Sequence, residues 1–158
     1  MKKKKNKVKS KKIANKVKIK KRAKLKRRMN KKFSERVSSG IENFDKLIEG
    51  GFIKYSTNTL VGGSGSGKTI LATQFLIEGL KKGEKCLYIT FEEKKEQFYS
   101  NMLKFNWDLA DYEKKGSFVF LEYSPAKVKT MLEEGGGAIE AIIIDKKVSR
   151  LVIDSITS

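Results

Sequence analysis

The chain has 158 residues, enough for one domain with a hydrophobic core, and a formal net charge of +18. The charge is concentrated at one end: residues 1–32 hold 16 Lys, 3 Arg and no acidic residue, which leaves the rest near neutral. The absence of His excludes imidazole catalysis, the single Cys86 excludes an internal disulfide, and no apolar run is long enough to span a membrane. Any catalysis must therefore use carboxylates, hydroxyls, Lys, Arg or backbone groups.

Residues 1–35 form a basic N-terminal tail. Its few apolar side chains cannot offset the entropy of ordering so many charges, so we expect it to be disordered in isolation. Residues 1–32 could bind DNA or RNA without sequence preference, through counterion release, or could be a solvated extension without function. A third interpretation is that translation begins at Met29. The tail lacks the apolar stretch of a secretory signal, which together with the lone Cys86 favours a cytoplasmic location.

Residues 36–158 are the predicted domain, in which helices and strands alternate. We expect helices at residues 39–48, 70–80, 96–107, around 128–132 and at 138–148, and strands at 57–61, 86–91, 117–121 and 151–154. The run from Cys86 to Phe91 is largely apolar, as is typical of a strand buried on both faces, and Cys86 is interpreted as a small core residue. The alternation predicts an α/β fold with a mainly parallel sheet and helices on both faces.

A phosphate-binding loop is the strongest motif. It consists of Gly62, Gly63, Ser64, Gly65, Ser66, Gly67, Lys68 and Thr69. Glycines let successive backbone N–H groups point at a phosphate, and the helix that begins near Lys68 directs its positive dipole end at the same oxygens. Lys68 can bridge the outer phosphates, and the Thr69 hydroxyl can ligate Mg²⁺. The alternative is a flexible Gly/Ser surface loop.

Three carboxylates lie at the carboxyl ends of predicted strands. Asp154 ends the strand at 151–154, on the edge of a parallel sheet where ligands bind, and can hold Mg²⁺ beside Thr69, usually through a water. Glu92 and Glu93 follow the strand at 86–91, and either can be the base that orients a water for attack on a γ-phosphate. The alternatives are a strand simply meeting its loop at Asp154, and two solvated loop acids at Glu92 and Glu93.

Several segments in order resemble the KaiC-like branch of the RecA superfamily of ATPases. They are residues 39–41, 44–45, 50–51, 62–69, 88–93, 106–109 and 151–157. The resemblance implies a three-layer, RecA-like P-loop NTPase fold. It implies Mg²⁺-dependent ATP binding and slow hydrolysis, with Lys68 and the Glu92–Glu93 pair in catalysis. It also implies homo-oligomeric rings with ATP at subunit interfaces. Some relatives autophosphorylate on Ser or Thr, and others act in recombination or signalling.

The sequence departs from this family at two turns and at its end. Ile53, Tyr55 and Asn106 stand where the family usually has Pro, Gly and Gly, which predicts altered turns. Family members continue beyond the equivalent of Ser158 with further strands, including one beside the Asp154 strand, and with a basic finger that reaches a neighbour's γ-phosphate. The chain therefore resembles a truncated domain whose sheet is incomplete at the C-terminal end. In such a sheet nothing fixes Thr69 and Asp154 at Mg²⁺ distance, and the last strand exposes unpaired backbone.

Three functional hypotheses follow. The first is a Mg²⁺-dependent ATPase with the residues named above. The second is a nucleotide-binding or nucleic-acid-tethering module without turnover, in which the basic tail supplies affinity. The third is a decayed product without activity.

Overall fold

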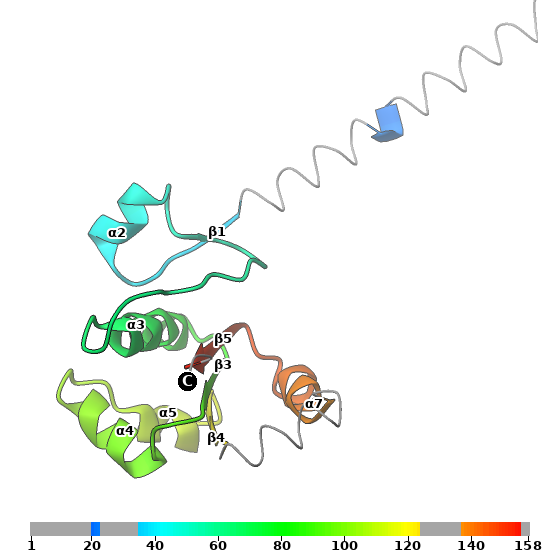
Figure 1. Ribbon diagram of the computed structural model, residues 1–158. Helices are drawn as coiled ribbons and strands as arrows, with labels where there is room; N and C mark the ends of the chain where they lie inside the picture. The colour runs from blue at the N-terminus through cyan, green and yellow to red at the C-terminus, as the bar shows by residue number, and fades with distance from the viewer. Residues whose placement is uncertain (1–19, 23–34, 124–136, 156–158) are drawn as a thin grey trace, which may run out of the picture.

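The computed structural model describes residues 20–22, 35–123 and 137–155 (Figure 1). The helices and strands are β1 (Arg36–Val37), α2 (Glu42–Leu47), β2 (Phe52–Ile53), α3 (Lys68–Lys81), β3 (Cys86–Thr90), α4 (Lys95–Leu103), α5 (Leu109–Lys114), β4 (Phe118–Glu122), α7 (Gly137–Lys146) and β5 (Arg150–Asp154). Within the basic tail, residues 20–22 are helical and exposed. The rest of residues 1–34 and the helix predicted around 128–132 lie outside the described residues, so those expectations stay predictions.

A parallel three-stranded sheet in the order β4–β3–β5 forms the centre of the fold. The register aligns Cys86 with Phe118 and Arg150, and Thr90 with Glu122 and Asp154. Every residue of β3 is buried, as its apolar run predicts for a central strand. Because the strands are parallel, their carboxyl ends meet at one edge, and the Glu92–Glu93 turn and Asp154 come together there.

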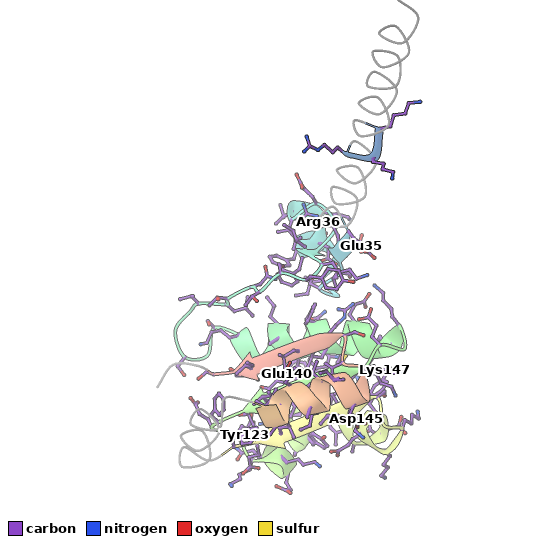
Figure 2. All side chains as sticks on the ribbon, turned by 90° about the vertical axis from the view of Figure 1, so that its right-hand side faces the viewer. Glu35, Arg36, Tyr123, Glu140, Asp145 and Lys147 are labelled. Carbon is purple, nitrogen blue, oxygen red and sulfur yellow. The ribbon has the colours of Figure 1, made fainter. Side chains whose placement is uncertain are left out.

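Helices cover both faces of this sheet, as the alternation of elements predicts. The three helices α3, α4 and α5 lie on one face and α7 on the other (Figure 1), and the view in Figure 2 looks onto α7. The core fills the space between the sheet and the helices α3, α4 and α5. Its buried members are Leu76, Ile77, Leu80, Cys86, Tyr88, Phe98, Met102, Leu109, Phe118 and Phe120. Cys86 is fully buried, and burial raises the pKa of its thiol to about 12, which fits a core residue.

A small N-terminal unit packs on α3. It consists of α2 and the antiparallel pair β1–β2, whose close approach depends on Gly51: a Cβ there would lie 2.2 Å from the Val37 carbonyl oxygen. Gln74 of α3 donates a 2.8 Å hydrogen bond to the Gly40 carbonyl, and the rings of Phe52 and Phe75 meet edge to face at 5.7 Å. The unit is therefore fixed to the same helix that begins at the phosphate-binding loop.

The strand predicted at 57–61 is wrong, since this segment is irregular and exposed. A strand needs a neighbour for its backbone hydrogen bonds, and among the described residues β5 pairs with β3 alone. The helix predicted at 96–107 ends earlier, at Leu103, and α5 follows it. The Asp108 side chain caps α5 by accepting a 3.0 Å bond from the Asp111 N–H, a cap that the sequence analysis missed.

Two departures from the family pattern leave the backbone glycine-like. Tyr55 and Asn106 adopt φ angles of 64° and 60°, in the left-handed region that glycine favours. The prediction of altered turns relative to the family stays a prediction. Within the described residues, no helix is long and apolar enough to cross a membrane.

Candidate functional site

The predicted phosphate-binding loop, residues 62–69, lies at the N-terminus of α3, where the sequence places it before a helix. Gly65 and Gly67 have φ angles of 73° and 86°, and Gly67 is the N-cap of the helix. A Cβ on Gly62 would lie 2.6 Å from the Ser66 Oγ, so a side chain there would displace the Ser66 hydroxyl. Residues 61–67 are exposed, which leaves the loop open to a ligand.

Lys68 bridges the two ends of the loop. Its Nζ donates to the carbonyl oxygens of Gly62 and Gly63, both at 2.8 Å. The first N–H groups of α3 have no partner within the helix and carry its positive dipole end. Phosphate oxygens would offer the ammonium and these N–H groups stronger, charge-assisted bonds than neutral carbonyls do. The loop can therefore hold an anion.

Asp154 faces the start of α3. Its Oδ2 accepts a 2.6 Å hydrogen bond from the Thr69 Oγ1 and a 2.8 Å bond from the Tyr88 hydroxyl. Although the described sheet lacks the strand expected beside β5, α3 packs against β5 and the bond holds Thr69 and Asp154 together. Burial, with the nearby Asp154 carboxylate, raises the pKa of the Tyr88 hydroxyl, which stays protonated and acts as the donor.

The glutamate pair lies at the same sheet edge, and its two members have different partners. The Thr90 Oγ1 accepts from the backbone N–H groups of Glu92 and Glu93 at 3.3 and 3.2 Å. The Ser155 hydroxyl donates to Glu92 Oε1 at 2.8 Å, whereas Asn101 of α4 donates to Glu93 Oε1 at 3.2 Å. Glu92 is thus tied to the residue after Asp154, and Glu93 to a helix.

The oxygens of Thr69 and Asp154 fit Mg²⁺. A hydroxyl and a carboxylate are hard donors, and Mg²⁺ typically combines one or two carboxylates with phosphate oxygens and water. The Thr69 hydroxyl has one proton and two lone pairs, so it can donate to Asp154 while a lone pair faces a cation. Residues 35–123 and 137–155 contain no cluster of three or more His, Cys, Asp or Glu side chains that could hold a metal alone, so bound phosphates would have to supply further ligands.

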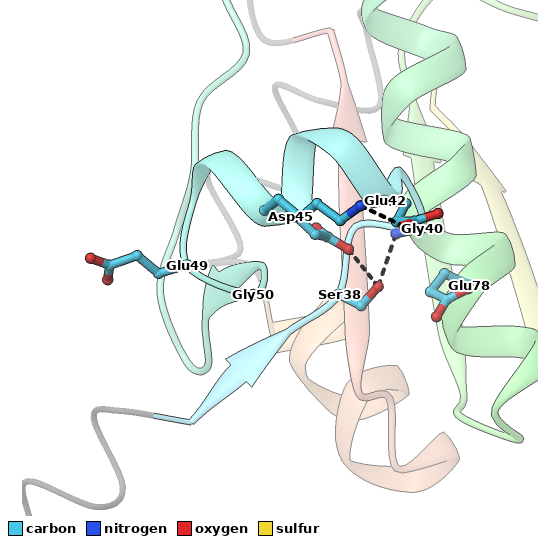
Figure 3. A pocket seen from close by; sticks show the side chains of 8 residues that line it. Ser38, Gly40, Glu42, Asp45, Glu49, Gly50 and Glu78 are labelled. Carbon is cyan, nitrogen blue, oxygen red and sulfur yellow. Dashed lines mark hydrogen bonds and ion pairs between the residues drawn. The ribbon is translucent and has the colours of Figure 1, made fainter.

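A separate pocket, wide open to solvent, lies between α2 and α3 (Figure 3). Its polar groups bond mainly to one another: Ser38 donates to Asp45 Oδ2 at 2.7 Å, and Lys46 pairs with Glu42 at 2.7 Å. Burial by itself would raise the pKa of Asp45, but hydrogen bonds from Ser39, Ser38 and Gly40 outweigh it and lower the pKa. The carboxylate thus organises the start of α2.

Four residues around the site escaped the sequence analysis: Tyr88, Thr90, Asn101 and Ser155. In the sequence, Tyr88 and Thr90 fall within a predicted strand and Ser155 at the end of a motif, where no role was expected of them. The alternation of side chains along β3 could have placed Tyr88 on the face of α3. The bond from Ser155 to Glu92 and that from Asn101 to Glu93 depend on the tertiary structure and leave no pattern.

The fold and this site together define a RecA-like P-loop α/β protein with an incomplete sheet. A family model described as "ATPase: KaiC" matches residues 37–158, and the chain belongs to this KaiC family of ATPases.

Individual relatives support this membership. The circadian clock protein KaiC3 of Synechocystis sp. is 36% identical over 129 residues, covering 77% of this chain and 26% of KaiC3. A UPF0273 protein of Pyrococcus horikoshii is 34% identical over 138 residues, covering 79% of this chain and 56% of that protein. The crystal structure of a KaiC-like protein from P. horikoshii OT3 has a TM-score of 0.68 and 39% identity, over 77% of this chain and 54% of the other. The chain thus spans about a quarter to a half of these relatives.

Proposed function

We propose that the chain binds Mg–ATP at residues 62–69 and hydrolyses it. The observation that carries this proposal is the 2.6 Å bond between Thr69 and Asp154, which are 85 residues apart in the chain. It joins the phosphate-binding loop to the carboxyl edge of the sheet, where the glutamate pair also lies. Membership of an ATPase family supports the same conclusion.

Each residue of the site has a role that follows from its chemistry. The loop N–H groups and Lys68 hold the phosphates. Thr69 and Asp154 would hold Mg²⁺, which when bound neutralises phosphate charge. Glu92, rather than Glu93, is the base that orients the attacking water, because its bond to Ser155 keeps it beside the Asp154 end of β5. Glu93, bonded to Asn101, connects the turn to α4.

The test compares ATP binding and phosphate release for the full chain and three variants. Lys68→Ala removes the ammonium, and we expect ATP binding about 10 to 100 times weaker. Glu92→Gln should bind ATP normally but lose turnover by about 10²–10⁴-fold, whereas Glu93→Gln, the matched control, should retain most of it. Equal ATP binding by wild type and Lys68→Ala would disprove the site. Equal loss in both Gln variants would disprove the assignment of Glu92.

The alternative of nucleotide binding without turnover is the outcome in which wild type binds Mg–ATP but releases no phosphate. The proposal includes self-association of the chain. Because the loop is exposed, a nucleotide bound there could also contact a second subunit. Sedimentation of the same samples measures whether the chain associates. Nucleic-acid binding by residues 1–32 stays a prediction from sequence.

A further inference from the structure

We propose that Tyr88 is a positioning residue of the cation site, whose hydroxyl holds the Asp154 carboxylate in the orientation that Mg²⁺ requires. The inference rests on the proposed function and extends it to a residue that touches neither nucleotide nor cation. It follows from the contact between the Tyr88 hydroxyl and Asp154 Oδ2 at 2.8 Å.

The Tyr88 ring is fixed by its surroundings. Tyr88 lies in the middle of the central strand β3 and is fully buried. Its ring lies 4.4 Å from the ring of Phe98 and stacks on Phe120 at 5.5 Å, as centroid distances. In register, Tyr88 pairs with Val152, so Asp154 is its diagonal neighbour on the same face of β5. A ring packed in this way presents its hydroxyl at one place.

That hydroxyl has a use that packing does not explain. The surrounding core residues are apolar, and a phenylalanine would make the same ring contacts. A buried hydroxyl costs free energy unless it is hydrogen-bonded, and the partner it has in the described structure is Asp154. The hydroxyl of Tyr88 therefore contributes a hydrogen bond to the Asp154 carboxylate and is not needed for packing of the core.

The two donors to Asp154 differ in what they can do when a cation binds. Thr69 lies at the end of the loop and would share its oxygen with the cation. Tyr88 approaches from the protein interior and remains bonded in either state. Groups that orient a metal-binding carboxylate in this way typically change metal affinity 10- to 100-fold when removed. Tyr88 thus sets the Mg²⁺ concentration at which the site fills.

The test is calorimetric titration of the full chain with ATP, first in chelator and then at increasing Mg²⁺. For Tyr88→Phe we expect unchanged ATP affinity in chelator and a Mg²⁺ midpoint raised about tenfold. The matched control is Tyr99→Phe, which deletes a phenolic hydroxyl bonded to another carboxylate, Glu113, at 3.1 Å. Its Mg²⁺ midpoint should equal that of wild type.

The outcomes separate this inference from the proposed function. Equal midpoints in Tyr88→Phe and wild type would overturn the role of Tyr88 and leave Mg–ATP binding intact. A wild type that binds no ATP would overturn both. If Tyr88→Phe does not fold, ring-labelled tyrosine in the wild type gives the answer by NMR. Mg²⁺ added to the ATP complex should shift the Tyr88 signal but not that of Tyr99, and an unmoved Tyr88 signal would overturn the inference.

Discussion

Thr90 determines how the two glutamates leave β3. It is 1% exposed, and its Oγ1 accepts from the N–H groups of both Glu92 and Glu93. A threonine hydroxyl that bonds to the backbone two and three residues later forms a tight local turn. The course of the backbone at both glutamates therefore depends on one buried oxygen.

Replacing Thr90 with valine, which has nearly the same shape, removes only that oxygen. We expect ATP affinity to change less than twofold and phosphate release to fall about tenfold, because the loop is untouched while Glu92 is misplaced. Thr73→Val is the control, since it deletes another buried hydroxyl, bonded to the Thr69 carbonyl at 2.8 Å within α3. Stopped-flow phosphate release measures both. Full activity in Thr90→Val would show that the turn orients itself without this bond.

At the level of elements, the helices end in a common way. After α3, α4, α5 and α7 the chain makes a pair of backbone bonds of the Schellman type around one left-handed residue. The left-handed residues are Gly83, Asn106, Gly116 and Lys147, with φ angles of 78°, 60°, 68° and 54°. Glycine and asparagine tolerate this conformation, whereas lysine is strained there. The end of α7 is thus the least favourable of the four.

Lys147→Gly is therefore expected to stabilise the chain by about 0.5–1 kcal/mol. The exposed side chain of Lys147 (Figure 2) makes this a change of backbone strain with little loss of packing. Chemical denaturation measures the effect. Asn106→Gly is the comparison and should gain less, because asparagine already accepts positive φ. A loss of stability in Lys147→Gly would mean that the lysine side chain contributes more than the strain removes.

The elements also show what the sequence could predict. The spacing of apolar residues predicted α3, and continuous apolar runs predicted β3 and β5, because these patterns are local to each segment. The strand at 57–61 was predicted from β-prone residues alone, and such a strand forms only beside a partner. Arg150 was missed because a charged residue is expected at the surface, yet it is 2% exposed. Its burial depends on partners distant in sequence.

In the whole molecule, Arg150 joins the N-terminal unit, α3 and the sheet. Its guanidinium bonds to Glu84 at 2.7 Å and to the carbonyl oxygens of Ser38 and Phe75 at 2.8 and 2.7 Å. It crosses α3 at Gly79, where a Cβ would lie 2.5 Å from the Arg150 Nε. One buried cation, whose counter-ion is Glu84, therefore holds the N-terminal unit, α3 and the sheet together.

This pairing predicts a dependence of stability on pH. The hydrogen bond from Arg150 lowers the pKa of Glu84 below its ordinary value of 4.5 despite partial burial. A carboxyl with a lowered pKa stabilises the fold above its unfolded pKa, and this contribution is lost as the pH falls through the folded value. Stability should therefore decrease below about pH 4.5, and Asp45, whose pKa is also lowered, adds to the decrease.

Glu84→Gln tests this by urea denaturation between about pH 7 and pH 3. We expect a loss of about 2 kcal/mol at neutral pH, because the buried Arg150 keeps a weaker, uncharged partner, and a shallower decline in acid. Glu49→Gln is the matched control, since Glu49 also pairs with an arginine, Arg36, at 2.7 Å but is 83% exposed. Exposed pairs contribute at most about 1 kcal/mol, so both its stability and its acid decline should follow wild type. If Glu84→Gln declined in acid as steeply as wild type, the acid sensitivity would belong to Asp45 and other carboxylates, not to the ion pair beneath α3.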